Sequence, residues 1–250
     1  MKSNKKITYG GIDGCKGGWL LVLQVENEHE AHILHTINEL EDQVKWQGRF
    51  LIDMPIGLTG PSYTRTIEAL MRKQLPGRAA TVFNAPTRKA IYATNKEEGR
   101  RLNIERTGKS ISEQSWNISG KIRELDTFLR STERKDIGLH ESHPELCFRY
   151  LHGEVVGSRK STPEGIEQRL QILERFEPNI RESYTRILHQ FPRKQVKRDD
   201  IVDALCLCIV NQLAGEQGWS RLQENLTLDE SGLEVGIFYF DPQRNNSVAK

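Results

Sequence analysis

The chain has 250 residues, a formal net charge of +2 and 28% charged residues. This length allows one large domain or two small ones with a proper hydrophobic core. No apolar run reaches the roughly 18 residues that a membrane span needs, and the lysine-rich N-terminus lacks the apolar segment of a secretory signal. The four cysteines form no Cys-x-x-Cys pair, which argues against a zinc site or a disulfide framework. We therefore expect a cytoplasmic protein without a membrane partner.

The first part of the chain predicts strands. Apolar runs at 7–12, 19–25 and 31–37 are separated by glycine-rich or acidic turns, a pattern typical of a strand meander. The first run ends at Asp13, which is followed at once by a glycine. On this stretch alone, a polar turn that happens to contain an aspartate is the favoured explanation over a functional carboxylate, since aspartate and glycine dominate turns. A helix is expected over 37–47.

The next strand ends at Asp53, because Pro55 cannot donate a hydrogen bond to a strand ladder. Residues 60–135 differ in character, since they are polar, basic and mostly helical in pattern. From 65 to 109 there are eleven Lys or Arg against four Asp or Glu, and 193–198 carries a second basic run. Both runs are either solvated faces or a track for phosphates. We interpret 60–135 as an insertion or cap on a single domain of residues 1–250.

The second half predicts one more strand and a series of helices. The strand at 136–142 leads into a helix at 143–151, which opens with a proline near its first turn. Two polar helices and an almost wholly apolar one follow, and the tail predicts a last strand; their ranges are 162–176, 178–190, 199–215 and 232–240. An apolar helix of this kind is buried against the sheet. The pattern indicates an α/β fold.

Aspartates on the apolar helix need an explanation. Asp200 and Asp203 share one helix face at a spacing of three, and Asp199 shares that face with Asp203 at a spacing of four. Capping of the helix N-terminus explains the first two aspartates, but Asp203 lies about a turn further in. Ionised groups on a buried face are costly without a partner.

Four further acids could lie in one site with these aspartates. Asp13 and Asp53 end strands, and Glu141 and Glu145 lie around the short motif ESHPE. A set made only of carboxylates suits Mg²⁺ or Mn²⁺. Two such ions about 4 Å apart can clamp the attacking and leaving oxygens of a phosphodiester. The acids together therefore favour phosphodiester chemistry.

Six motifs appear in order along the chain: GIDGCKGGW, LIDMPIGL, PGRAATVFNAPTR, SISEQSW followed by KIRELD, ESHPELCF and DDIVDAL. In these motifs the chain resembles the DUF429 family of predicted RNase H-like nucleases, over about residues 7–240. The final motif also resembles the Asp-x-x-Asp-Ala-Leu pair of RuvC-type resolvases. The resemblance implies an RNase H-like mixed sheet flanked by helices, with the first and fourth strands as parallel neighbours and the helical insertion after the fourth.

The resemblance also implies roles for individual residues. Asp13 and Asp53 would bind metal at adjacent strand ends, Glu145 or less favourably Glu141 would add a ligand, and Asp200 with Asp203 would complete the site from the helix. Substrate binding is expected of basic and polar residues in or near the motifs, namely Lys16, Arg78, Arg88, Gln114, Lys197 and Arg198, with Arg72 and Lys73 flanking the cleft.

The leading hypothesis is a nuclease that uses two Mg²⁺ or Mn²⁺ ions on DNA, RNA or a nucleotide. A phosphotransferase of the actin and sugar-kinase type shares the strand topology, but the turn GCKGGW has no Ser or Thr for a phosphate loop and no second copy of the fold is seen. A silent nucleic-acid-binding protein is a third possibility. It gives no reason to keep several like charges in one site.

Overall fold

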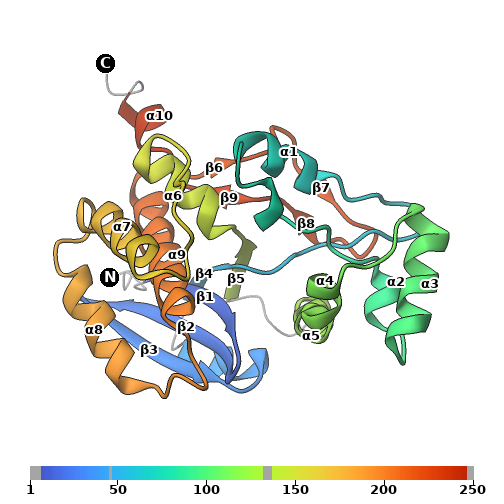
Figure 1. Ribbon diagram of the computed structural model, residues 1–250, viewed down its shortest axis with the longest axis horizontal. Helices are drawn as coiled ribbons and strands as arrows, with labels where there is room; N and C mark the ends of the chain where they lie inside the picture. The colour runs from blue at the N-terminus through green and yellow to red at the C-terminus, as the bar shows by residue number, and fades with distance from the viewer. Residues whose placement is uncertain (1–6, 45–46, 132–136, 247–250) are drawn as a thin grey trace, which may run out of the picture.

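A mixed five-stranded sheet forms the centre of the protein (Figure 1). The computed structural model describes residues 7–44, 47–131 and 137–246. The strands are β1 (Ile7–Cys15), β2 (Gly18–Val25), β3 (Glu28–Leu34), β4 (Gln47–Ile52) and β5 (Ile137–Glu141), in the order β3-β2-β1-β4-β5. β1 pairs with β4 in parallel, and β4 pairs with β5 in parallel, whereas β2 is antiparallel to both of its neighbours. The predicted α/β fold and the parallel pairing of the first and fourth strands are confirmed.

Helices from the second half of the chain cover one face of the sheet. They are α6 (Pro144–His152), α7 (Pro163–Glu174), α8 (Ile180–Gln190) and α9 (Arg198–Gln217). α9 lies directly on the sheet, with all residues from Ile201 to Asn211 buried. It approaches β1 so closely that a Cβ atom on Gly11 would lie 2.2 Å from the carbonyl oxygen of Ala204. The glycines of the first strand therefore admit a helix backbone.

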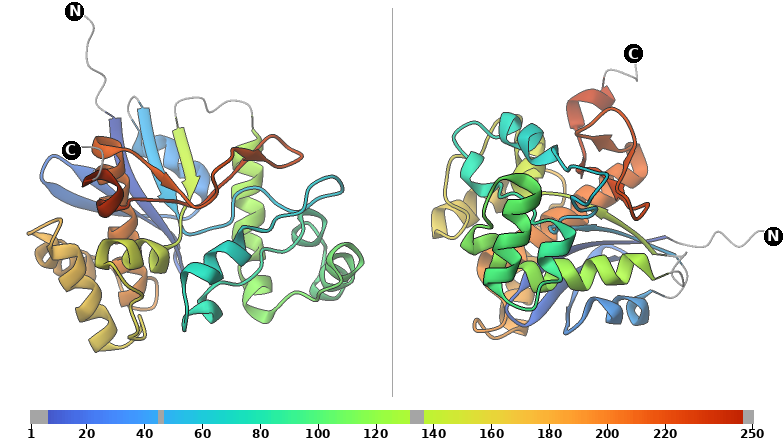
Figure 2. Two further views of the ribbon diagram at one scale, coloured as in Figure 1. Left: turned by 90° about the horizontal axis from the view of Figure 1, so that it is seen from above. Right: turned by 90° about the vertical axis from the view of Figure 1, so that its right-hand side faces the viewer.

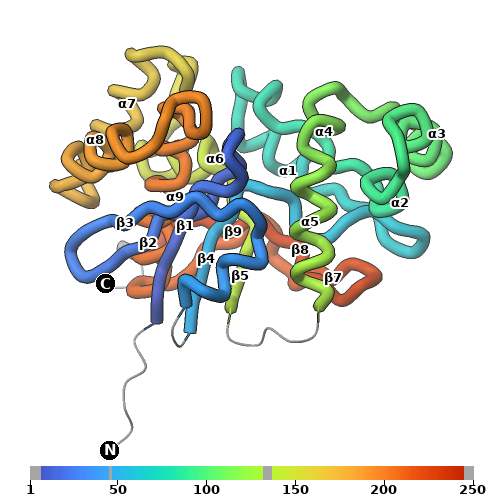
Figure 3. The backbone as a smooth tube through the Cα atoms, turned by 90° about the horizontal axis from the view of Figure 1, so that it is seen from below, coloured from blue at the N-terminus to red at the C-terminus, as the bar shows by residue number. Residues whose placement is uncertain are grey.

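The other face is covered partly by the predicted insertion. The chain between β4 and β5 forms α1 (Ile67–Gln74), η2 (Ala79–Thr81), α2 (Arg88–Ile91), α3 (Lys96–Thr107), α4 (Glu113–Asn117) and α5 (Ser119–Arg130). Side chains of α5, among them Ile122 and Leu125, join Ile12 and Ile52 in one hydrophobic cluster. α5 runs beside the β5 edge of the sheet (Figures 2 and 3). The insertion is thus part of the core as well as a cap.

Two predicted elements differ in the structure. The segment 37–47 contains a 3₁₀-helix, η1 (Ile37–Gln43), and residues 45 and 46 lie outside the described residues. The predicted last strand at 232–240 is two short strands, β8 (Glu234–Val235) and β9 (Phe238–Tyr239), which Gly236 separates. They pair with β7 (Thr227–Leu228) and β6 (Ser220–Arg221) in two small sheets, and α10 (Pro242–Asn246) follows. Glycine weakens the interior of a strand.

Within the described residues, no helix is both long enough and apolar enough to cross a bilayer.

Candidate active site

Three aspartates from separate elements meet at one end of the sheet. Asp13 lies near the end of β1, and Asp53 follows β4 directly. The parallel register pairs Ile12 with Ile52, so both aspartates leave the sheet at the same level, and the Asp53 amide donates to the Ile12 carbonyl oxygen at 3.0 Å. The close packing of α9 on β1 brings Asp203 to the same place. The structure thus gathers Asp13, Asp53 and Asp203.

This cluster is short of partners for its charge. Burial raises the pKa of Asp13 well above its ordinary value, and the charges of Asp53 and Asp203 raise it further. Burial also raises the pKa of Asp203 to about 6. The Asp203 side chain is fully buried, and its Oδ1 atom has no hydrogen-bond partner among the residues that the structure describes. A buried carboxylate oxygen without a donor is costly, and it is the acceptor that a cation would satisfy.

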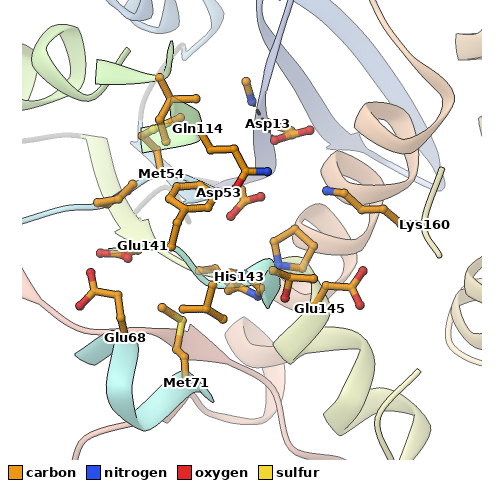
Figure 4. A pocket seen from close by; sticks show the side chains of 18 of the residues that line it. Asp13, Asp53, Met54, Glu68, Met71, Gln114, Glu141, His143, Glu145 and Lys160 are labelled. Atoms are coloured by element: carbon orange, nitrogen blue, oxygen red, sulfur yellow. Dashed lines mark hydrogen bonds between the residues drawn. The ribbon is translucent and has the colours of Figure 1, made fainter. Parts of the chain in front are cut away.

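Lys160 supplies the nearest positive charge. Its Nζ atom donates to Asp203 Oδ2 at 2.5 Å, and the Asp203 carboxylate raises the pKa of Lys160 well above its usual value. In Figure 4 the Lys160 side chain extends toward Asp13 and Asp53 from the far side of the cavity. The sequence analysis missed Lys160, since it is one of 36 basic residues and lies in the polar loop between α6 and α7.

Asp200 has a structural partner as well as a place in the site. Its Oδ2 atom accepts a hydrogen bond of 2.8 Å from the backbone amide of Lys197 at the start of α9. Burial raises its pKa. Asp199, Asp200 and Lys197 all line the same cavity as Asp13. The capping explanation therefore accounts for Asp200, while its carboxylate still faces the site.

Glu145 lies near Asp203 but is neutralised. Arg169, a fully buried residue of α7, donates from Nη2 to both carboxylate oxygens of Glu145 at 2.7 and 2.9 Å. Arg78 adds a contact of 3.5 Å from the insertion. Arg78 thus faces a protein carboxylate and is absent from the lining of the cavity. The expected metal ligand Glu145 has the geometry of a structural ion pair.

Glu141 at the end of β5 is also paired with an arginine, although burial still raises the pKa of its carboxyl group to about 7. Arg65 makes two hydrogen bonds with its carboxylate, at 2.5 and 3.0 Å, and the Ile56 amide donates to it at 2.7 Å. Arg65 also pairs with Glu68 at 2.5 Å. Burial alone would lower the pKa of Arg65, but these two carboxylates raise it. Glu141 therefore anchors the insertion to the sheet, although its side chain borders the cavity.

Arg88 lies away from the three aspartates. It is buried and bonded to Asp126 and Asp229, and it contacts Glu230 at 3.5 Å. These acids of the protein already surround the guanidinium group, and Arg88 does not line the cavity, so the structure does not bring this predicted substrate contact to the aspartates. Of the other predicted contacts, Gln114 and Lys197 line the cavity, whereas Lys16 and Arg198 are exposed outside it.

The cavity between sheet and insertion has a volume of about 460 Å³. Asp13, Asp53 and Lys160 line it. It also has an apolar wall, which comes mainly from the insertion: Met54, Met71, Val82, Phe83 and Ile118. Lys121 lies at the edge, where its ammonium group stacks 4.5 Å from the centre of the Trp19 ring. The arrangement accommodates a ligand with both an anionic group and an apolar face.

The donor set of the cluster fits a hard cation. Among the described residues, no group of three or more His, Cys, Asp or Glu side chains is arranged to hold a metal ion as it stands. However, the unpartnered Asp203 Oδ1 and the mutual charge of Asp13 and Asp53 are the features that Mg²⁺ or Mn²⁺ would neutralise. The residues present therefore fit such an ion, with Lys160 close by.

The model of the family described as "Protein of unknown function (DUF429)" matches residues 11–224. The chain belongs to the DUF429 family. The matched region runs from β1 to the segment after β6 and so contains every residue of the aspartate cluster. No curated protein and no solved structure matched the chain.

Proposed function

We propose that this DUF429 protein is a metal-dependent nuclease that hydrolyses phosphodiester bonds of nucleic acid. The observation that carries the proposal is the buried Asp203 Oδ1 atom, which has no donor within the described part of the chain although Asp13 and Asp53 crowd the same site. A protein that only binds nucleic acid gains nothing from such a costly cluster. The five-stranded sheet, with its first and fourth strands parallel, supports the RNase H-like fold that the resemblance implies.

Asp13, Asp53 and Asp203 would hold Mg²⁺ or Mn²⁺, and Asp200 lies beside them. The bound metal would supply Lewis-acid stabilisation of the charge that develops on a phosphate during attack by water. Two ions are the arrangement expected for this chemistry. Glu145 and Glu141 are left out of the ligand set, because Arg169 and Arg65 already occupy their oxygens.

The chain's own cations would bind and orient the substrate. Lys121, Lys160 and Lys197 line the cavity, so a phosphate entering it would meet the positive charge of these lysines. Burial lowers the pKa of Lys121. The apolar wall formed by residues such as Met71 and Phe83 would exclude water from the cavity.

The phosphotransferase alternative has less support. The turn between β1 and β2 consists of Lys16 and Gly17, with no hydroxyl side chain to contact a phosphate. The described chain has one large sheet and two two-stranded sheets, without a second copy of the five-stranded one. All four cysteines are free and buried, which suits the reducing cytoplasm that we propose as its setting.

The test is cleavage of labelled single-stranded and duplex DNA and RNA with Mn²⁺, Mg²⁺ or a chelator. The wild-type protein should cleave only with metal, and Asp13→Asn and Asp203→Asn should each lose the activity. Glu164→Gln is the control, because Glu164 is exposed outside the cavity. Equal cleavage by the wild type and both aspartate variants would refute the proposal.

A further inference from the structure

A second hollow adjoins the acid cavity on the insertion side. Its volume is about 630 Å³, and it lies between α1, the segment 83–86, the end of α3 and the segment 109–115. We call it the insertion groove. Four residues line both hollows: Arg65, Glu68, Phe83 and Gln114. Figure 4 shows Gln114 reaching toward Asp53 in the acid cavity. The acid cavity and the insertion groove thus meet along these shared side chains.

The insertion groove has a positive lining. Its basic side chains beyond Arg65 are Arg72, Arg106 and Lys109. Glu68 is the one acid in the lining, and it is buried and paired with Arg65. The contrast with the acid cavity is clear, since there the carboxylates outnumber their cations. A polyanion that leaves the acid cavity would therefore meet an attractive surface in the insertion groove.

The two arginines are held in place with donors to spare. Arg72 uses Nε and Nη2 to bind the Val82 carbonyl and Asn84. Arg106 uses the same two atoms to bind the Gly60 carbonyl and Thr64. Among the described residues, the Nη1 atoms of Arg72 and Arg106 have no hydrogen-bond partner. The exposed ammonium group of Lys109 has no partner there either. These three groups can donate to phosphate without breaking an existing bond.

Phe83 adds an aromatic surface where the two hollows join. It is half-buried and follows Val82, which belongs to the apolar wall. Nucleobases stack on such rings, and every base offers a face for this contact. Within a duplex, neighbouring bases cover both faces of each base. The Phe83 ring could therefore stack only on an unpaired base.

We propose that the insertion groove binds a single-stranded segment of nucleic acid that flanks the scissile phosphate. Backbone phosphates would lie along Arg72, Arg106 and Lys109, and an unpaired base would stack on Phe83. The inference rests on the proposed nuclease function and deepens it, because it assigns the substrate class: DNA or RNA with an unpaired segment of a few nucleotides next to the cleavage site.

Binding is measured by fluorescence anisotropy in a chelating buffer, so that cleavage plays no part. The probes are strands of about 12 nucleotides of deoxythymidine or uridine and a duplex of the same length. We expect the wild-type protein to bind at least one single strand more tightly than the duplex, and comparison of the two strands distinguishes DNA from RNA. Equal or tighter binding of the duplex would overturn the inference.

Charge variants test the phosphate contacts. Arg72→Gln with Lys109→Gln should weaken strand binding and reduce the slope of log K against log salt by roughly 1.4, at about 0.7 for each contact. Lys109→Gln alone should reduce the slope by about 0.7. Because the Lys109 side chain has no partner among the described residues, a weaker slope in this variant cannot be attributed to loss of folding. The control is Arg175→Gln with Arg193→Gln, two exposed arginines outside both hollows. The same slope in all four proteins would overturn the inference.

Phe83 gives an independent readout. Phe83→Ala should weaken strand binding roughly 5- to 150-fold without changing the salt slope, and Phe83→Tyr should restore most of the affinity. Unchanged binding in Phe83→Ala would contradict the stacking contact. The two proposals can also fail separately: retained groove binding without any Mn²⁺-dependent cleavage would refute the nuclease and support the groove.

Discussion

Two groups of buried carboxylates in this protein differ in how many positively charged partners the fold gives them. On the insertion side, Glu141 and Glu68 share Arg65, and Asp126 and Asp229 share Arg88, so each acid accepts from a guanidinium group. At the end of the sheet, Lys160 pairs with Asp203, and the other oxygen of Asp203 has no donor among residues 7–44, 47–131 and 137–246. Burial of a carboxylate alone therefore does not mark a functional site. A buried acid that the fold leaves unneutralised is the informative feature.

The largest effect is expected from breaking a neutralised group. Arg65→Met leaves Glu141 and Glu68 buried without their partner, which should lower the free energy of unfolding by about 3–5 kcal/mol. Urea unfolding measures the loss. The matched control is Arg101→Met, which removes an exposed pair with Glu105 and should change stability little. Equal stability of the two variants would mean that the buried arginine is not what holds the insertion to the sheet.

The next largest effect is the pH dependence of stability that comes from Asp203 in the unneutralised group. Burial raises the pKa of Asp203 to about 6 in the folded protein, so the folded state binds more protons than the unfolded state between roughly pH 4 and 6. The stability that this group contributes is present below pH 4 and is lost as pH rises through 6. Asp203→Asn does not lose this stability as the pH rises. Over this pH window its free energy of unfolding should therefore rise relative to that of the wild type by an amount on the order of 2–3 kcal/mol.

The comparison is made by urea unfolding of both proteins at several pH values. Burial lowers the pKa of His29 to about 4, so this residue titrates in the same range with the opposite effect on stability. Its contribution is common to both proteins and cancels in the difference. A difference in stability that does not change between pH 4 and 6.5 would show that Asp203 ionises normally.

A smaller effect should follow from removing the lysine of the aspartate cluster. Lys160 is 39% exposed, so its pair with Asp203 is partly screened by solvent. Lys160→Met should cost about 1–2 kcal/mol in metal-free buffer. It should also increase the melting shift caused by Mn²⁺, because a cation then becomes the main partner of Asp203. A variant with normal stability and a normal Mn²⁺ shift would separate Lys160 from the site.

For Asp13→Asn the direction of the change is the test. This substitution removes a crowded charge and keeps nearly the same shape, so the metal-free variant should be as stable as the wild type or more stable. An aspartate that serves only to accept the Gly14 amide, 2.8 Å from its Oδ1, would instead lose stability on substitution. Thermal melting in a chelating buffer distinguishes the two cases.

The sequence predicted the frame of the site well. Apolar runs and turn residues located β1 and β4, and the spacing of Asp200 and Asp203 on an apolar helix marked α9, because these features are local in the chain. The meeting of the two strand-end aspartates was predicted from the parallel pairing that the family resemblance implied. The predicted last strand failed because its pairing depends on where β6 and β7 lie.

The partners of the acids could not be predicted. Glu145 and Asp203 both appear in motifs, but Glu145 meets Arg169, 24 positions away, whereas Asp203 meets Lys160, 43 positions away. Arg169 and Lys160 carry no local signal, since each is an ordinary basic residue in a polar sequence. Which carboxylate is neutralised depends on how helices pack in space, and spacing along the chain does not encode that packing.

The central claim is that Asp13, Asp53 and Asp203 form a site for a divalent cation. Calorimetric titration of the wild-type protein with Mn²⁺, beside Asp13→Asn and the exposed-surface control Glu164→Gln, tests it most directly. We predict saturable binding by the wild type and the control, and binding at least tenfold weaker by Asp13→Asn, which corresponds to about 1.4 kcal/mol. Equal Mn²⁺ binding by all three proteins, or none by the wild type, would contradict the account.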